Sequence, residues 1–144
     1  MNRRNAALLA SAALLLAGCG NAARTRSQVA ADDVCNARNQ IGTDVAGIQA
    51  TVVSPGTPLT IAMEVNDIRA KLLTIGLAQR ALPPAVGLPV RRAAVSFAVA
   101  SRPIATGLRL APAGEVSLPR YALFTTAQKK LGPVYTSTLG ALPC

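Results

Sequence analysis

The chain has 144 residues, of which 15 are lysine or arginine and only 6 are aspartate or glutamate, giving a formal net charge of +9. It contains no histidine, which excludes serine or cysteine nucleophiles that depend on a neighbouring imidazole. It also has no glycine-rich phosphate loop. We therefore expect one domain with a modest core, no enzymatic activity and no cofactor.

The N-terminus has the three zones of a secretory signal peptide. Residues 1–5 are short and basic, residues 6–17 are apolar and rich in alanine and leucine, and small residues follow. The apolar run is too short to cross a bilayer, which needs about 20 apolar residues. This pattern predicts export of the mature chain.

The signal ends in the tetrapeptide Leu16-Ala17-Gly18-Cys19, which resembles the lipobox of bacterial lipoproteins. The resemblance implies that the Cys19 thiol receives a diacylglyceryl group and that cleavage after Gly18 makes Cys19 the first mature residue. Two or more acyl chains give stable membrane anchoring, whereas a single chain binds marginally. The alternative is an ordinary signal peptide with an unrelated cysteine.

The lipobox resemblance, which covers the first nineteen residues, implies a signal peptide and a location, and the composition of the residues that follow predicts a tether and a domain. Residues 1–18 form the signal peptide, residues 19–28 a lipidated flexible tether, and residues 29–144 the folded domain. The lipid holds the domain on the exported side of the cell membrane or of the outer membrane. The mature domain is similar to small helical domains of actinobacterial secreted lipoproteins, but this similarity carries no specific function.

The three cysteines of the chain divide into one lipid site and one pair. Once Cys19 is assigned to lipid, Cys35 and Cys144 remain, and they allow a single pairing. Exported compartments permit disulfides, so we expect this pair to form one. The alternative is two free thiols. No metal site is expected, because two cysteines without histidine cannot complete a tetrahedral zinc site.

The expected tether is small and polar and includes Arg24 and Arg26. These arginines are candidate contacts to an anionic membrane surface, where each basic residue contributes about 1 kcal/mol. The alternative is a linker whose arginines are simply solvated.

The first helix is predicted from about residue 30 to 53, where apolar residues recur at helical spacing. Asp32 and Asp33 fall in its expected first turn, where the helix dipole favours negative charge. Residues 54–56, Ser-Pro-Gly, end it because proline disfavours a helical residue before it. The apolar stripe consists of Val34, Ile41, Val45, Ile48 and Val52.

The second helix is predicted from about residue 58 to 81, with Thr57 as its N-cap. Asp67 and Lys71 stand four residues apart in the order that favours a helical ion pair. Residues 82–89 contain three prolines and a glycine and are expected to form a linker. The apolar stripe of this helix consists of Ile61, Val65, Ile68, Leu72 and Ile75.

The third helix is predicted to begin near Pro89 or Val90 and to kink at Pro103, because proline removes a backbone hydrogen bond. A strand is the alternative here, since residues 95–99 also alternate between polar and apolar. The residues expected to share one helical face are Val90, Ala94, Phe97, Ser101, Ala105 and Leu108.

The fourth helix is predicted from about residue 118 to 138, and Gly132-Pro133 is expected to bend it or split it. Its expected inner face consists of Tyr121, Phe124, Leu131, Tyr135 and Thr138.

Four helices of similar length with short connections predict an all-α fold, a four-helix up-down-up-down bundle. In that topology the start of the first helix and the end of the fourth lie at the same end. Cys35 and Cys144 would then be neighbours, which agrees with the expected disulfide.

The acidic residues offer one candidate for catalysis. Glu64 and Asp67 are three residues apart and would share a helix face, as a carboxylate pair in a hydrolase does. We favour a solvated surface for both, with Asp67 paired to Lys71.

Basic pairs at Arg91-Arg92 and Lys129-Lys130 are further candidate contacts to an anionic surface. The sequence favours a lipid-anchored interaction module that docks on an envelope protein or an anionic polymer. The alternative is a carrier that holds an apolar ligand between its helices. Nucleic acid is not an expected partner, because the chain is exported and has few aromatic residues for base stacking.

Overall fold

The structure, a computed structural model, describes residues 24–51, 57–109 and 118–144. The expected all-α class is confirmed, and no strand occurs among these residues. Because one helix runs through the described part of residues 90–108, the strand alternative is excluded. The elements are α1 (Arg26–Ala50), α2 (Thr57–Ala78), the 3-10 turn η1 (Gln79–Ala81), α3 (Pro84–Arg109), α4 (Leu118–Ser137) and the 3-10 turn η2 (Leu139–Ala141).

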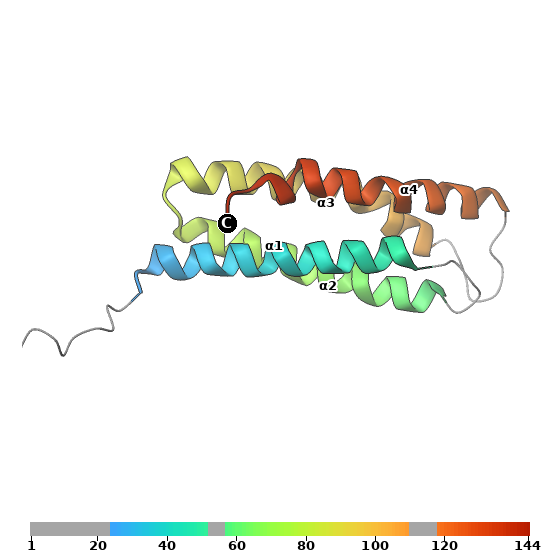
Figure 1. Ribbon diagram of the computed structural model, residues 1–144, viewed down its shortest axis with the longest axis horizontal. Helices are drawn as coiled ribbons and strands as arrows, with labels where there is room; N and C mark the ends of the chain where they lie inside the picture. The colour runs from blue at the N-terminus through green and yellow to red at the C-terminus, as the bar shows by residue number, and fades with distance from the viewer. Residues whose placement is uncertain (1–23, 52–56, 110–117) are drawn as a thin grey trace, which may run out of the picture.

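The helices form the expected up-down-up-down bundle, in which α1 and α3 each pack on both α2 and α4 (Figure 1). α1 and α3 begin at one end of the bundle, where α2 finishes and the chain turns through η1. The C-terminal residues come back toward the same end. We call it the tether end, because the expected tether precedes α1, and we assign to it residues 24–35, 74–92 and 139–144.

α1 begins four residues before the predicted start, so residues 26–28 are helical rather than part of the tether. The cause is a capping box: the Thr25 hydroxyl accepts from the Gln28 backbone N–H, and the Gln28 side chain accepts from that of Thr25. With this start, the first turn of α1 contains no acidic residue, and Asp32 and Asp33 lie beyond it.

α3 also begins earlier than predicted, at Pro84 instead of near Pro89, so much of the expected linker is helical. Proline suits a first turn because its missing N–H has no intrahelical partner there. The backbone N–H groups of Val86 and Gly87 donate to the Pro83 carbonyl, each at 2.9 Å, and close that turn. α3 then continues through Pro103, whose exposed position leaves the unpaired carbonyl of the preceding turn near solvent.

α4 is one helix that continues through Pro133, so of the two outcomes expected at residues 132–133, a bend or a split, the split is excluded. As in α3, proline leaves a carbonyl of the preceding turn without its hydrogen bond. That carbonyl belongs to Lys129, and it lies near solvent because Pro133 and Lys129 are both exposed. Beyond Ser137 the chain tightens into η2, where the Thr138 hydroxyl donates to the Val134 carbonyl at 2.6 Å. Residues 142–144 then leave the helix axis and turn toward α1.

The core is mostly aliphatic and contains two aromatic residues, Phe97, which is fully buried, and Phe124. In α1, every residue of the predicted apolar stripe that the structure describes is buried. In α2, the buried residues of the predicted stripe are Ile61, Ile68 and Ile75. Fully burying a side chain of this size contributes about 1.5–3 kcal/mol. The side chains of Tyr121, Leu108 and Val52 lie outside the described residues. The largest fully buried residues are Phe97, Ile41, Ile48, Ile61, Ile75, Ile104 and Leu139.

One buried polar side chain, Gln128, joins α4 to the end of α1. Its Nε2 donates to the carbonyl of Ile48 and, at 3.0 Å, to that of Thr51. The last carbonyls of a helix have no intrahelical donor, and leaving them buried without one costs about 1–3 kcal/mol each. Gln128 therefore satisfies the C-terminus of α1 from inside the bundle.

Candidate functional site

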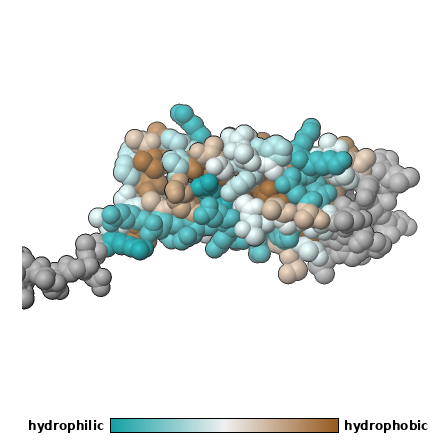
Figure 2. Space-filling model, in the orientation of Figure 1, coloured by the Kyte–Doolittle hydropathy of each residue, from teal (hydrophilic) through white to brown (hydrophobic). Residues whose placement is uncertain are grey.

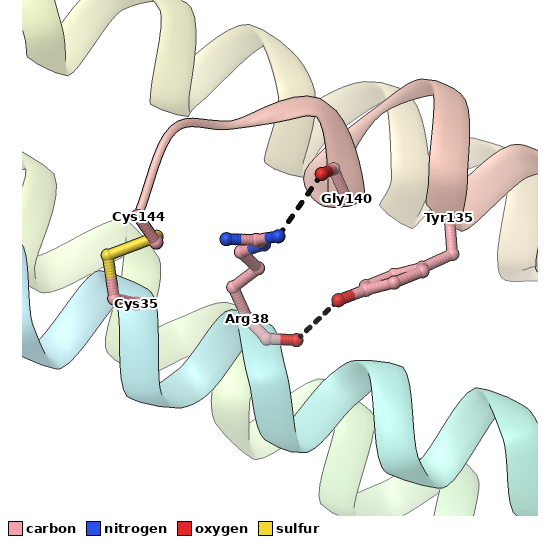
Figure 3. The surroundings of a disulfide bond; sticks show 5 residues. All are labelled: Cys35, Arg38, Tyr135, Gly140 and Cys144. Carbon is pink, nitrogen blue, oxygen red and sulfur yellow. Dashed lines mark hydrogen bonds between the residues drawn. A yellow bond between two sulfur atoms is a disulfide. The ribbon is translucent and has the colours of Figure 1, made fainter.

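The Cys35–Cys144 disulfide fastens the C-terminus to α1 (Figure 3). The Cα atoms are 5.7 Å apart, within the usual range for a disulfide. Next to it, an Arg38 guanidinium nitrogen donates to the Gly140 carbonyl at 3.2 Å, and the Tyr135 hydroxyl donates to the Arg38 carbonyl at 3.0 Å. The expected pairing is thus present, and two hydrogen bonds hold the same segment.

A glycine of α1 makes room for Tyr135 in this region. A Cβ placed on Gly42 would lie 2.6 Å from the Tyr135 hydroxyl oxygen and 2.9 Å from the ring carbon that bears it. No side chain fits there without moving the ring, so the absence of a side chain at Gly42 permits the close approach of α4 to α1.

The basic residues proposed from sequence do not form one surface. Arg24, Arg26, Arg91 and Arg92 all belong to the tether end, and Arg80 in η1 joins them there. Lys129 and Lys130 lie elsewhere, on α4 next to Gln128, which contacts the opposite end of α1. All of these described side chains are exposed. The sequence did not indicate Arg80, because it has no second basic residue beside it.

One ion pair occurs at the tether end: Arg24 and Asp32 are 2.8 Å apart and both well exposed. Pairs of this kind contribute little to stability, because solvent screens them. No other ion pair found among the described residues involves an arginine, so Arg26, Arg80, Arg91 and Arg92 offer their charge to a partner.

The bundle is incomplete at the tether end. Figure 1 shows that the C-terminal tail stops short of the first turns of α1 and α3. The uncovered faces form an apolar cleft of about 190 Å³, visible in Figure 2 as a hollow with brown residues above the start of α1. We call it the open cleft. It is lined by Ala31, Val34, Cys35, Leu82, Ala85, Val86, Pro89, Val90, Leu142 and Pro143.

Val86 shows most clearly that apolar side chains are left uncovered in the open cleft. It stands one helical turn before the buried Val90 and lines the same cleft, yet it is 49% exposed. Three further large apolar side chains of the tether end are also exposed, namely Val29, Leu77 and Leu88. Val86 was not among the predicted residues, because residues 82–89 were expected to form a linker. A step of one helical turn back from Val90 along the apolar stripe of α3 leads to it.

A charged cluster lies between α1 and α2. Lys71 pairs with Asp44 of α1 at 2.7 Å, and both side chains are mostly buried, with exposures of 21% and 15%. The expected helical pair between Asp67 and Lys71 is thus replaced by a bridge between helices. Glu64 approaches α1 at Gly47, where a Cβ would lie 2.7 Å from its carboxylate. One Glu64 oxygen, Oε2, is buried without a hydrogen-bond partner.

Burial raises the pKa of Glu64, and the nearby carboxylates of Asp44 and Asp67 raise it further. The folded chain therefore holds this proton more tightly than the unfolded chain. The ordinary pKa of a glutamate is 4.5, and we expect the free energy of unfolding to fall as the pH rises from below this value through the raised pKa of Glu64. The Glu64→Gln variant should not show this loss, because its side chain does not titrate. Urea midpoints at about pH 4 and pH 7 test this. Asp33→Asn, at an exposed carboxyl of the tether end, is the control; an unchanged pH effect in Glu64→Gln would contradict the assignment.

A second cleft, of about 230 Å³, opens between α2 and α3. Its floor includes the buried Ile48 and Leu131, and two exposed arginines, Arg69 and Arg102, line it. Small-molecule sites usually occupy about 300–1,000 Å³. The cleft therefore gives the carrier hypothesis only limited support.

The outward faces of α2 and α3 combine apolar and basic side chains. α2 packs on α3, and large apolar residues are exposed on both helices away from the core. Arg69 and Arg102 are exposed beside the cleft that separates the two helices. We call this the α2–α3 outer surface. It consists of Met63, Leu73, Val95, Val99, Arg69 and Arg102.

Three features bear on other kinds of site. The described residues contain no group of three or more cysteine and acidic side chains that could hold a metal ion. No described helix is both long enough and apolar enough to cross a membrane. Cys19, the predicted lipidation site, lies outside the described residues.

Comparisons with protein-family models, curated proteins and solved structures found no match to this chain.

Proposed function

We propose that this protein is a lipid-anchored, exported envelope module that acts without catalysis by binding an envelope protein through the α2–α3 outer surface. The proposed anchor is the acylated Cys19, as the lipobox resemblance implies. The observation that supports the docking role is the surface itself. It exposes four large apolar side chains on two neighbouring helices, and one arginine is exposed on each of the same helices.

The composition of this surface favours a protein over an anionic polymer. A polyanion would be held by basic side chains and would gain nothing from exposed leucine, valine and methionine. Protein interfaces are enriched in methionine and arginine, and contiguous exposed apolar patches mark interaction sites. The expected partner therefore presents apolar residues with acidic residues around them.

The anchor is tested with the full chain expressed in a host that processes lipoproteins. We expect Cys19→Ser to move the protein from the membrane fraction to the soluble exported fraction. The intact mass of the membrane-bound wild type should correspond to a chain that begins at a diacylated Cys19. An unlipidated mass, or an unchanged distribution of Cys19→Ser, would contradict the anchor.

The docking surface is tested by photo-crosslinking in the native envelope. A photoreactive residue at Leu73 or Val99 should give a discrete adduct, and Arg69→Glu with Arg102→Glu should reduce its yield several-fold. The control position is Leu123 on α4, which is 72% exposed and lies outside this surface. Equal adduct yields at Leu73 and Leu123, or no dependence on the arginines, would refute the proposed surface.

A further inference from the structure

The tether end combines uncovered apolar surface with a concentration of positive charge. The open cleft exposes Val86, and Val29, Leu77 and Leu88 are exposed around the same end of the bundle. α4 ends at Ser137 and leaves Val86 in the open cleft half-exposed, whereas Val29 and Leu77 line a separate hollow between α1 and α2 at the same end. A bundle whose fourth helix continued past Ser137 would cover the first turns of α1 and α3.

The net charge of the side chains at this end is positive. Five arginines belong to it, while its acidic residues are Asp32 and Asp33, and Asp32 already pairs with Arg24. The other acidic residues that the structure describes are Asp44 and Glu64, in the charged cluster between α1 and α2, and Asp67, near that cluster on α2. An anionic surface would therefore meet a net positive and partly apolar face. The arginines are Arg24, Arg26, Arg80, Arg91 and Arg92.

The position of the predicted anchor limits what this end can reach. Cys19 precedes Arg24 by five residues, and an extended chain spans at most about 3.6 Å per residue. Arg24 therefore lies within about 18 Å of an acylated Cys19. The start of α1 is held beside whatever surface the acyl chains enter.

We propose that the tether end is a membrane-contact surface for an anionic phospholipid bilayer. Its apolar side chains enter the interfacial region of the bilayer, and its arginines bind lipid phosphates. The inference rests on the proposed lipid anchor, because the acylated Cys19 brings this end to the bilayer. It also gives the module an orientation, since a bundle seated on the tether end leaves the α2–α3 outer surface accessible along its length.

The absence of tryptophan makes a direct test simple, because one introduced tryptophan is the only one in the chain. The lipidated protein carrying Val86→Trp is reconstituted into vesicles of phosphatidylglycerol and phosphatidylcholine with brominated acyl chains. We expect at least a threefold stronger quenching than for Leu123→Trp, the control on α4. Arg80→Glu with Arg91→Glu, or vesicles of phosphatidylcholine alone, should reduce the quenching of Val86→Trp by half or more. Circular dichroism checks that each variant remains helical.

The possible failures are distinguishable. If the protein co-floats with vesicles but both tryptophans are quenched equally weakly, the anchor stands and the membrane-contact surface is refuted. If the protein does not co-float, the anchor fails and the inference fails with it. A tryptophan emission of the Val86→Trp variant that shifts to shorter wavelength with rising protein concentration, without vesicles, would assign the surface to a second copy of the chain and overturn the proposal.

Discussion

Replacing Cys35 or Cys144 by serine is expected to lower the free energy of unfolding by about 4.7 kcal/mol, one of the two largest losses we predict for a single substitution. The two cysteines are 109 residues apart in sequence, so their bond closes a loop that includes nearly the whole described chain. A cross-link over such a loop removes conformational entropy from the unfolded state, and the effect grows with loop length. Small domains have total stabilities of only about 5–15 kcal/mol, so the reduced protein should be marginal.

Guanidinium unfolding of the oxidised protein, the reduced wild type and both serine variants tests this expectation. The two single variants and the reduced wild type should have the same midpoint, because each lacks the same cross-link. A loss below about 1 kcal/mol would mean that residual structure in the unfolded chain already brings its ends together. A larger loss for Cys35→Ser than for Cys144→Ser would indicate that Cys35 also contributes packing inside the cleft that it lines.

Much of the fold was predictable because burial leaves a periodic trace in the sequence. The predicted stripe residues Val34, Ile41, Val45 and Ile48 are all buried, and the expected topology correctly placed Cys35 beside Cys144. Each of these predictions needs only that a helix turn one apolar face inward. That requirement does not depend on which neighbour covers the face.

Helix starts were less predictable, because local hydrogen bonds and proline chemistry set them. The Thr25 and Gln28 pair has the spacing of a capping box, and this signal was present in the sequence. The prolines of residues 83–89 predict a break in the helix, but Pro84 stands in a first turn, where proline is favoured, and α3 continues through Pro89. Pro84 therefore opens α3 well over a turn before the predicted start.

Contacts between helices could not be predicted from spacing along one helix. The sequence offers Lys71 a partner at Asp67, but Asp44 of α1 lies close enough to bind it in a site shielded from water. Likewise, nothing in the sequence around Gln128 indicates that its side chain donates to a carbonyl at the end of α1. For the basic residues, sequence proximity identified pairs, but only the bundle shows that Arg91 and Arg92 join Arg24 and Arg26 while the lysines of α4 do not.

Phe97→Ala is expected to cost about 3–5 kcal/mol, as truncation of a fully buried aromatic residue usually does. Phe97 has no exposed surface and is the largest of the fully buried residues. Its ring also forms a T-shaped pair with that of Tyr135, with centroids 6.1 Å apart and ring planes at 82°. Thermal and urea unfolding measure the loss. Leu123→Ala, at an exposed site of α4, is the control and should change stability by less than about 0.5 kcal/mol.

Phe97→Ala and Cys35→Ser are also expected to be coupled, because a continuous set of contacts joins the two sites. Phe97 packs on Tyr135, and Tyr135 donates to the carbonyl of Arg38, three residues from Cys35 along α1. Phe97→Ala should weaken the contacts of Tyr135 and so the packing of the C-terminal residues on α1. The double variant should therefore lose less stability than the sum of the two single losses. A deviation from additivity of about 0.5 kcal/mol or more supports the coupling, since independent sites add within about 0.3–0.5 kcal/mol. Strict additivity would mean that the disulfide acts on the unfolded chain alone and that Tyr135 serves only the core.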